Sequence, residues 1–268
     1  MRHRIQAGLA VPIVIALTAV VGPATTRQVA TVSDPPESNL PTPASVLGFA
    51  PCTDYKLANY EQITSYLTRL DKASERMKLM TIGKTAEGRD QVMGIVSSPD
   101  NLEPANLDKY RGIAERLAHA RNLTDAQAHE LAAAGKTVAW VDFGIHSTEV
   151  APTQTAPQFA YDLVRSESAE AKSIRKNVIT LFDPNVNPDG TTHVSDWYMK
   201  YVGTQYEDSD YPELYQKYSG HDDNRDWFMF NLSETRNLAN QLWHQWYPEL
   251  LYDTHQTAAY PARIFLPP

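Results

Sequence analysis

The sequence has almost no cysteine and no cluster of basic residues. Cys52 is the one cysteine among 268 residues, which excludes an internal disulfide and any fold that depends on one. The 24 Lys and Arg stand against 32 Asp and Glu, so the net charge is −8, which argues against a nucleic-acid partner. One apolar run near the N-terminus is short for a bilayer span, and no second apolar stretch is long enough to cross one. The remaining composition, 42% hydrophobic and 21% charged, is typical of a globular protein.

The N-terminus has the layout of a secretory signal peptide. Basic residues at 2–4 precede an apolar run at 9–21, and small residues follow it. We therefore expect a signal peptide over residues 1–24, with cleavage near Ala24, and export to the extracellular space or the periplasm. No stable membrane span is expected after cleavage. An uncleaved signal anchor is the alternative.

Residues 25–54 form the next segment, which is rich in proline, serine and threonine. Such a segment buries too little apolar surface to offset the entropy lost on ordering, so it predicts a flexible linker. The folded domain is then expected over residues 55–268.

Within this domain, helical and strand-like patterns alternate along the chain. Apolar residues at helical spacing predict helices over 56–71, 107–117, 125–134, 151–164 and 233–246. Apolar runs predict strands at 79–82 and 91–96, which form a hairpin, and at 137–143, 178–182 and 250–253. Residues 184–222 are expected to form a long loop. This pattern predicts an α/β fold, with a mixed, largely buried sheet and helices on both faces.

Two of the predicted strands end on residues that bind metals. The strand that ends at Phe143 leads to His146 and Glu149, and the last strand leads to His255. Two imidazoles and a carboxylate are the three ligands that a catalytic zinc needs, with the fourth position left for water. Open α/β sheets also place their ligand sites at such strand ends. The pattern favours a hydrolase; the alternative is a helix-capping Glu149 and a structural His255. Asp253 is either a carboxylate that orients His255 or an ordinary strand-end residue.

Two further segments match motifs of a known family, in the same order along the chain. Residues 183–190 contain Asn-Pro-Asp-Gly, which taken alone is a turn sequence, and residues 223–227 contain Asn224 and Arg225, which taken alone fit a surface salt bridge. With Glu87-Gly88-Arg89, the tail at 260–265 and the metal-binding candidates, they make the chain from about Tyr55 onward resemble the zinc metallocarboxypeptidases. This is the carboxypeptidase A-like family, and the tail is similar to its bacterial-type branch.

The resemblance implies a role for each matching residue. It implies one zinc ion per chain held by His146, Glu149 and His255, and a substrate carboxylate bound by Asn224 and Arg225. It implies a carboxypeptidase-like fold and hydrolysis of the C-terminal bond of peptides, or of peptidoglycan stems, by a zinc-activated water.

Three departures from the family pattern accompany the resemblance. Thr148 stands where many members carry arginine, and the carbonyl-polarising arginine has no clear match, with Lys200 as the nearest cation. The family's general-base glutamate follows the third zinc ligand at some distance, so it is expected beyond Pro268, and Glu249 lies too early to be that base. The catalytic domain is therefore expected to be partial, without its C-terminal part.

Two other functions stay open. A zinc acylase of the aspartoacylase-like type also combines His-x-x-Glu with a later histidine and would deacylate small amino-acid conjugates. A non-catalytic peptide-binding protein would keep the zinc and the carboxylate contacts without a base.

Overall fold

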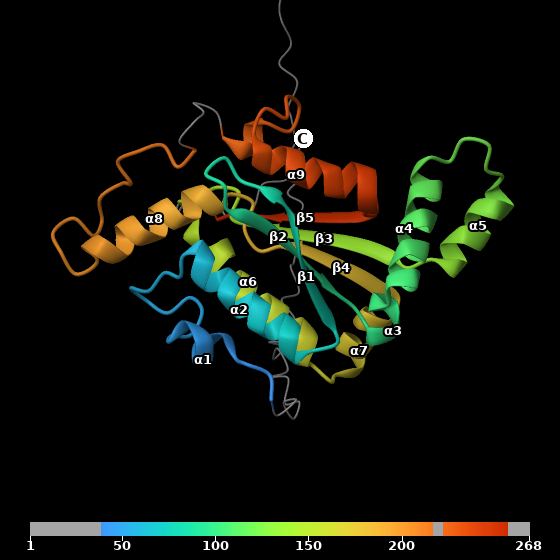
Figure 1. Cartoon of the computed structure of the whole chain (residues 1–268), viewed down its shortest axis with the longest axis horizontal. Helices are drawn as coiled ribbons and strands as arrows, with labels where there is room; N and C mark the ends of the chain where they lie inside the picture. Colours follow the sequence, from blue (N-terminus) through green and yellow to red (C-terminus); the bar gives the residue numbers. More distant parts are fainter. Residues whose placement is uncertain (1–38, 217–221, 257–268) are drawn as a thin grey trace, which may run out of the picture. The chain divides into compact units, whose positions relative to one another are not determined.

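A five-stranded sheet in the order β1-β2-β4-β3-β5 is the centre of the computed structural model, which describes residues 39–216 and 222–256 (Figure 1). β1 is antiparallel to β2, and β2 to β4, whereas β4, β3 and β5 run parallel. The predicted mixed sheet is confirmed. The strands are β1 (Met77–Lys84), β2 (Asp90–Val96), β3 (Thr137–Phe143), β4 (Val178–Asp183) and β5 (Leu250–Thr254).

Helices cover both faces of this sheet, as the sequence predicts. One face packs against α2 (Tyr60–Ala73) and α6 (Val150–Arg165). The other packs against α4 (Pro104–Ala118), α9 (Ser233–Asn240) and η2 (Gln241–Trp246), the π-helical continuation of α9. The remaining helices are α1 (Pro43–Leu47), α3 (Pro99–Leu102), α5 (Asp125–Ala134), α7 (Ala169–Asn177), α8 (Pro188–Tyr201) and the 3₁₀ helix η1 (Asp223–Arg225).

α2 shows how the sequence produces these elements. Asn59 and Gln62 form a capping box at its N-terminus, which satisfies backbone N–H groups that have no partner inside the helix. Its residues Ile63, Leu67 and Leu70 recur at helical spacing, and all three are completely buried against the sheet. Each such side chain stabilises the fold by about 1.5–3 kcal/mol relative to exposure. The helix predicted over 56–71 is therefore confirmed, with bounds shifted toward the C-terminus.

The central strands carry apolar side chains on both faces, because helices cover both. In β4, Leu181 packs in the core beneath α4 and α9, whereas the next residue, Phe182, packs in the core beneath α2 and α6. Gly94 on the neighbouring strand β2 leaves room for the Phe182 ring, since a methyl group there would collide with it. This explains why a glycine occurs inside an otherwise apolar strand.

The predicted long loop at 184–222 is wrong for its first part, which contains α8. Pro188 occupies the first turn of this helix, and the Asn187 side chain caps it by accepting a hydrogen bond from the Gly190 N–H at 2.9 Å. Thr191 and Val194 on the first two turns are buried. The Asn-Pro-Asp-Gly sequence thus starts a buried helix, a role for which an Asn cap and a following proline are well suited.

The predicted flexible linker at 25–54 does not describe residues 39–54. This segment contains α1, which Thr42 caps, and its apolar side chains Leu40, Val46 and Phe49 pack against the core between α2 and α6. These contacts bury apolar surface, which the composition of the segment alone does not predict. Residues 25–38, the signal peptide expected at 1–24 and the tail at 260–265 lie outside the described residues.

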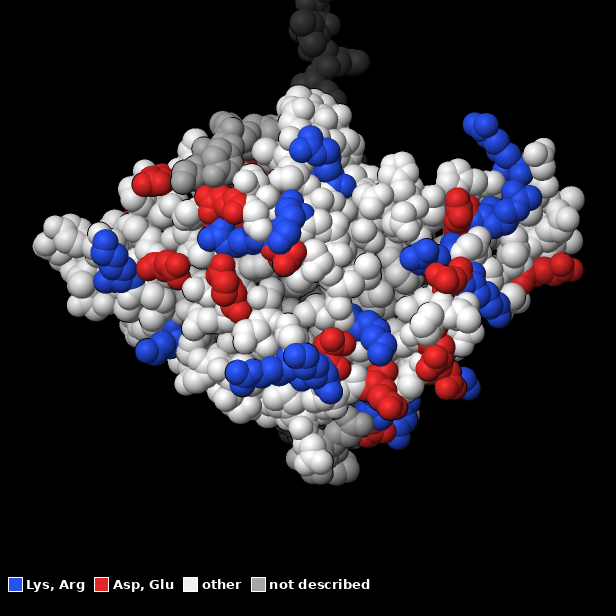
Figure 2. Space-filling model, in the orientation of Figure 1, with Lys and Arg blue, Asp and Glu red and all other residues white. Residues whose placement is uncertain are grey.

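Two observations bear on the surface. Within the part of the chain that the structure describes, no helix has the length and apolar character needed to cross a membrane. On the face drawn in Figure 2, Lys and Arg are interspersed with Asp and Glu, so this face carries no continuous basic stripe.

Candidate metal centre

Three metal-binding side chains meet at the C-terminal ends of β3 and β5. His146 and Glu149 follow β3, with Glu149 immediately before α6, and His255 follows β5. β3 and β5 are parallel neighbours, and Asp142 pairs with Asp253, so their ends lie side by side. One donor atom from each of the three residues lies within 4.8 Å of the others. The structure therefore brings together the residues that the sequence singled out.

The Glu149 carboxylate lies between the two imidazoles. Its Oε1 is 2.8 Å from His146 Nδ1, and its Oε2 is 3.2 Å from His255 Nδ1. The two rings are 5.0 Å apart, centroid to centroid. On tetrahedral zinc, bonds of about 2.0–2.1 Å separate neighbouring ligand atoms by about 3.3 Å. Two nitrogen donors and one carboxylate at these separations fit a metal ion, and all three side chains retain some solvent exposure.

Backbone contacts hold Glu149 in its charged form. The Gln256 N–H donates to Glu149 Oε2 at 2.7 Å, and the Gln256 side chain accepts from the Ala151 N–H at 2.9 Å. Partial burial raises the pKa of Glu149, but the Gln256 N–H and the two histidines outweigh it, so the pKa is lower than usual. The carboxylate is thus ionised at neutral pH, which is the form that binds metals.

Each imidazole also has an acidic neighbour at its other ring nitrogen. His255 Nε2 is 2.9 Å from Asp253 Oδ2, and His146 Nε2 is 3.7 Å from Asp222 Oδ2. Carboxylates at the outer nitrogen commonly orient metal-binding histidines. The contact between Asp253 and His255 is the one that an orienting carboxylate requires. Asp222 was not identified from the sequence, although it directly precedes the segment 223–227.

A glycine turn places His146 beyond the end of β3. Gly144 has φ +69°, a left-handed conformation that strains other residues. A methyl group at Gly144 would collide with Thr153 on α6 and with Asn185 after β4. The Asn185 amide is fixed there, because it donates to both Thr153 and Thr191 at 2.7 Å. This close packing leaves glycine as the fitting residue two positions before His146.

Asn224 and Arg225 lie on η1, beside the centre. Asp222 precedes η1 and approaches His146, so η1 starts next to one of the imidazoles. Arg225 is exposed, its Nη1 donates only to the Asn224 carbonyl at 3.3 Å, and no ion pair involves it within the described ranges. Its guanidinium is therefore accessible to a carboxylate.

The two aspartates of the same segment are buried, and one of them, Asp226, has a structural role. The buried Asp226 accepts hydrogen bonds from the Asn231 and Leu232 N–H groups and from Thr235, which fixes the start of α9 against η1. The equally buried Asp223 has a pKa well above the usual value, because burial and then the nearby Glu234 disfavour its charge. The Asp226 contacts fix the backbone that follows Asn224 and Arg225.

Neither Glu249 nor Lys200 belongs to this centre. Glu249 Oε2 accepts from the Val138 N–H at 2.6 Å, at the opposite end of β3 from His146. The Lys200 ammonium lies 5.1 Å from the centre of the Tyr201 ring, near the C-terminal end of α8. The expectation that Glu249 is not the general base agrees with this position.

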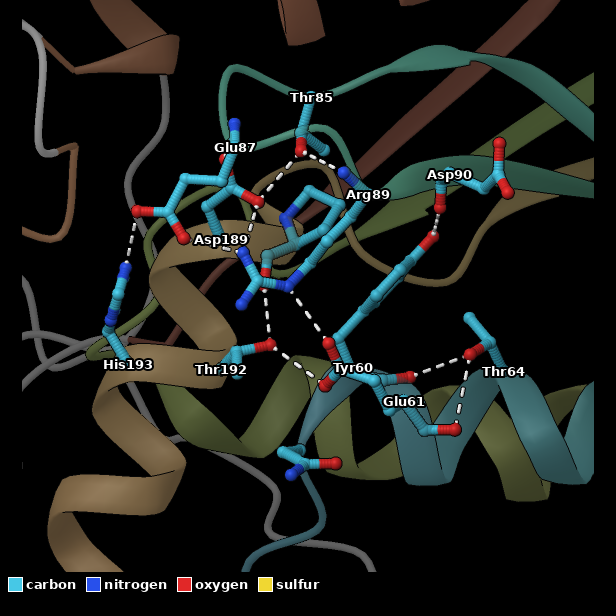
Figure 3. Close-up of polar contacts among 12 residues, drawn as sticks. Tyr60, Glu61, Thr64, Thr85, Glu87, Arg89, Asp90, Asp189, Thr192 and His193 are labelled. Carbon is cyan, nitrogen blue, oxygen red and sulfur yellow. Dashed lines mark hydrogen bonds and ion pairs between the residues drawn. The ribbon is translucent and has the colours of Figure 1, made fainter.

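A charged network links the β1–β2 turn to α8 (Figure 3). Arg89 Nη1 lies 2.8 Å from Asp189 Oδ1 and 2.6 Å from Glu87 Oε2, and its Nε lies 2.9 Å from Glu61 Oε1. Asp189 also accepts from the Thr85 hydroxyl and from the Glu87 N–H, both at 2.8 Å. The network places the first turn of α8, so the residues after Asn-Pro are held by the hairpin turn.

Gly190 connects this network to the loop of the metal centre. Gly190 follows Asp189, and a methyl group at Gly190 would collide with the Ser147 hydroxyl and the Tyr215 carbonyl. Ser147 directly follows His146. The position of α8 therefore limits the position of the loop that carries His146 and Glu149.

The profile of the family described as zinc carboxypeptidase matches residues 63–255, whereas no curated protein matches the chain. The similar structures include a metallo-carboxypeptidase from Burkholderia cenocepacia, with 16% identity and a TM-score of 0.50 over 76% of this chain and 42% of that one. A carboxypeptidase A from Helicoverpa armigera has 15% identity and a TM-score of 0.49 over 81% of this chain and 52% of that one.

At 16% identity and a TM-score of 0.50, the Burkholderia cenocepacia structure supports the fold alone. The chain spans about half or less of the length of these two structures. The matched family profile is stronger evidence, because it covers more than half of the chain and contains the hairpin, α8, η1 and all three metal-binding candidates. The chain belongs to the zinc carboxypeptidase family.

Proposed function

We propose that this protein is a zinc-dependent metallocarboxypeptidase that hydrolyses the C-terminal peptide bond of peptides. The observation that carries the proposal is the convergence of His146, Glu149 and His255 within 4.8 Å at the ends of two parallel strands. Membership of the zinc carboxypeptidase family supports the choice of zinc and of peptides.

In this proposal His146, Glu149 and His255 hold one zinc ion per chain. Bound zinc would polarise the scissile carbonyl and activate a water molecule. Asp253 orients the His255 imidazole, Asp222 lies 3.7 Å from the His146 imidazole, and the Gln256 N–H keeps Glu149 in place. The general base is not assigned to Glu149, which acts as a ligand.

Asn224 and Arg225 bind the terminal carboxylate of the substrate. Arg225 is exposed and lies on η1, beside His146. A guanidinium can donate two parallel hydrogen bonds to a carboxylate, which selects peptides with a free C-terminus. The proposal extends to export by residues 1–24, for which N-terminal sequencing of the mature protein is the test.

Zinc binding tests the centre. Metal-free protein should take up one zinc per chain in isothermal titration and elemental analysis, and His146→Ala or His255→Ala should abolish this uptake. His129→Ala is the matched control, because His129 is exposed on α5. Unchanged zinc content in both site variants would show that the assigned residues do not hold the metal.

Substrate assays test the reaction. We expect release of the C-terminal amino acid from peptides with a free carboxylate and none from the same peptides as C-terminal amides. Arg225→Met should raise KM with little change in zinc content. Hydrolysis of N-acyl amino acids in preference to peptides would indicate an acylase, and peptide binding without turnover a non-catalytic protein. A stem peptide of peptidoglycan forms a separate arm of the panel.

A further inference from the structure

A cavity opens beside the metal loop, the segment that carries His146 and Glu149. Its volume is about 480 Å³, which lies in the range of small-molecule sites. Its walls come from residues 52–57, the start of α6, α8 and residues 207–211. Thr148, which stands between two of the proposed zinc ligands, forms part of the wall. None of the three ligand candidates, nor Asn224 or Arg225, lines it, so it is distinct from the centre described above.

The walls of this pocket are held by specific contacts. The buried Gln154 side chain on α6 accepts from the Ala58 N–H at 2.8 Å and donates to the Ala58 carbonyl at 2.9 Å. The Leu57 N–H approaches Met199 Sδ on α8 at 3.3 Å. These contacts fix the segment that precedes α2 against both helices, so the cavity is a defined feature of the fold.

Aromatic side chains make much of the pocket surface. Trp197 on α8 meets Tyr211 edge to face, with ring centroids 6.0 Å apart, and Tyr198 and Tyr55 also line the cavity. Tyr55 has φ +63°, a strained conformation for an aromatic residue, and yet 63% of it is exposed. Backbone strain of this kind clusters at binding sites, and here it presents a ring at the pocket rather than burying it.

The charge of the lining is mainly negative. Glu207 and Asp210 contribute carboxylates, against one ammonium from Lys56. Glu207 is held in place, since its Oε2 accepts from the Gly203 N–H at 2.6 Å. The pKa of Tyr198 is raised, first by burial and then by acidic neighbours that include Glu207. Aromatic faces and carboxylates together favour a cation carried on an apolar stem.

The position of the pocket relates it to a bound peptide. Arg225 lies on η1, which begins after Asp222 beside His146, and the pocket is lined by Thr148, two residues after His146 in the same loop. In the orientation of the proposed function, with the carboxylate of the peptide at Arg225 and its last peptide bond at the centre, we infer that the upstream part of the peptide passes Thr148. Extended chain advances about 3.3 Å per residue, so residues a few positions upstream reach the cavity.

We propose that this pocket binds the side chain of a lysine or arginine that precedes the scissile bond of the substrate. The orientation of the peptide depends on the proposed function. The affinity of the pocket for a basic side chain depends only on the residues that line it.

Binding to metal-free protein tests the pocket without hydrolysis. The probes are N-acetyl-arginine methylamide, its norleucine analogue and its glutamate analogue, followed by titration calorimetry. The arginine probe should bind best. The double substitution Glu207→Gln and Asp210→Asn should weaken it about fivefold, because contacts with partly exposed carboxylates are individually weak. The norleucine probe should be unaffected. Glu130→Gln, an exposed change on α5, controls for the loss of a surface carboxylate outside the pocket.

Equal affinity for the three probes, or no binding of any, would overturn the proposal, as would an arginine affinity unchanged in the double variant. Circular dichroism of the variants separates these outcomes from misfolding. A peptide series with one arginine moved along the upstream positions then locates the residue that lowers KM. Zinc uptake with no arginine binding refutes this inference alone, whereas arginine binding without zinc uptake refutes the proposed function.

Discussion

Asp183→Asn should remove much of the pH dependence of stability. Asp183 is the last residue of β4 and is completely buried. Burial raises the pKa of its carboxyl to about 7, although hydrogen bonds from the Asn185 N–H, at 2.8 Å, and from Gln91 Nε2, at 3.1 Å, lower it in part. Asparagine has nearly the same shape and cannot ionise. It also replaces one of the two acceptor oxygens by a donor, but that cost does not vary with pH, so the dependence of stability on pH isolates the charge.

The expected magnitude follows from proton linkage. The folded chain keeps the Asp183 proton up to a pKa of about 7, whereas the unfolded chain loses it near the ordinary value of 3.8. Between these values the folded state binds more protons, so the free energy of unfolding falls as the pH rises. At about 1.4 kcal/mol per pH unit, the loss amounts to at most about 4 kcal/mol across this window. Above pH 7 both states are ionised and the difference is constant.

Urea unfolding of the metal-free chain between pH 4 and pH 8 measures this effect. The wild-type free energy of unfolding should fall relative to that of Asp183→Asn over the whole window. Asp223, whose pKa burial also raises, is present in both proteins and does not depend on Asp183, so its contribution cancels in the difference. The charge of Asp183 adds to the raised pKa of Asp142, so the difference between the two proteins includes this smaller contribution from Asp142. Asp108→Asn, an exposed change on α4, should keep the wild-type slope. Parallel curves for wild type and Asp183→Asn would mean that Asp183 is charged in the folded state, contrary to the reasoning.

Three further predictions concern the metal loop and its support. Gly144→Ala should lower the free energy of urea unfolding by about 2–3 kcal/mol and weaken zinc binding, because Gly144 has φ +69° and a methyl group there would collide with α6. Gly112→Ala on α4, where a methyl group meets open space, should be neutral or stabilising. Equal effects of the two changes would contradict this explanation. Arg89→Met should lower the free energy of unfolding by about 2 kcal/mol, because it leaves Asp189 and its acidic neighbours without their cation. Arg89→Lys should recover part of this loss. An unchanged stability of Arg89→Met would show that the network is dispensable. Glu149→Gln should reduce zinc affinity at least about tenfold in a competition titration, and unchanged affinity would remove this residue from the ligand set.

Elements whose signals are local were the predictable part of the fold. The strand at 137–143 has the bounds of β3, and the helix after Thr124 begins with the capping box that Thr124 and Gln127 form. In such cases hydrophobic period and cap chemistry lie within a few residues, so the sequence contains the whole signal. α6 formed despite Pro157, since eight of its residues are buried and tertiary packing compensates for the lost hydrogen bond.

Elements that depend on distant contacts were missed. α8 starts at a sequence that is locally a turn, and its first residues become helical in contact with the hairpin and α2. Residues 39–54 have the composition of a linker, but Leu40 and Phe49 pack against helices more than ten residues away. Asp222 was missed for the same reason, because only the folded chain brings it beside His146.

The structure also explains why motifs remote from the metal ligands made the family resemblance specific. Glu87-Gly88-Arg89 and Asn187-Pro188-Asp189-Gly190 are separated by about a hundred residues and contribute no donor to the centre. In the fold they bind each other, since Arg89 and the Glu87 N–H both contact Asp189. Gly190 then packs against Ser147, next to His146. The two motifs therefore act together to fix the position of the loop that carries His146 and Glu149. Either turn sequence alone would not predict that position.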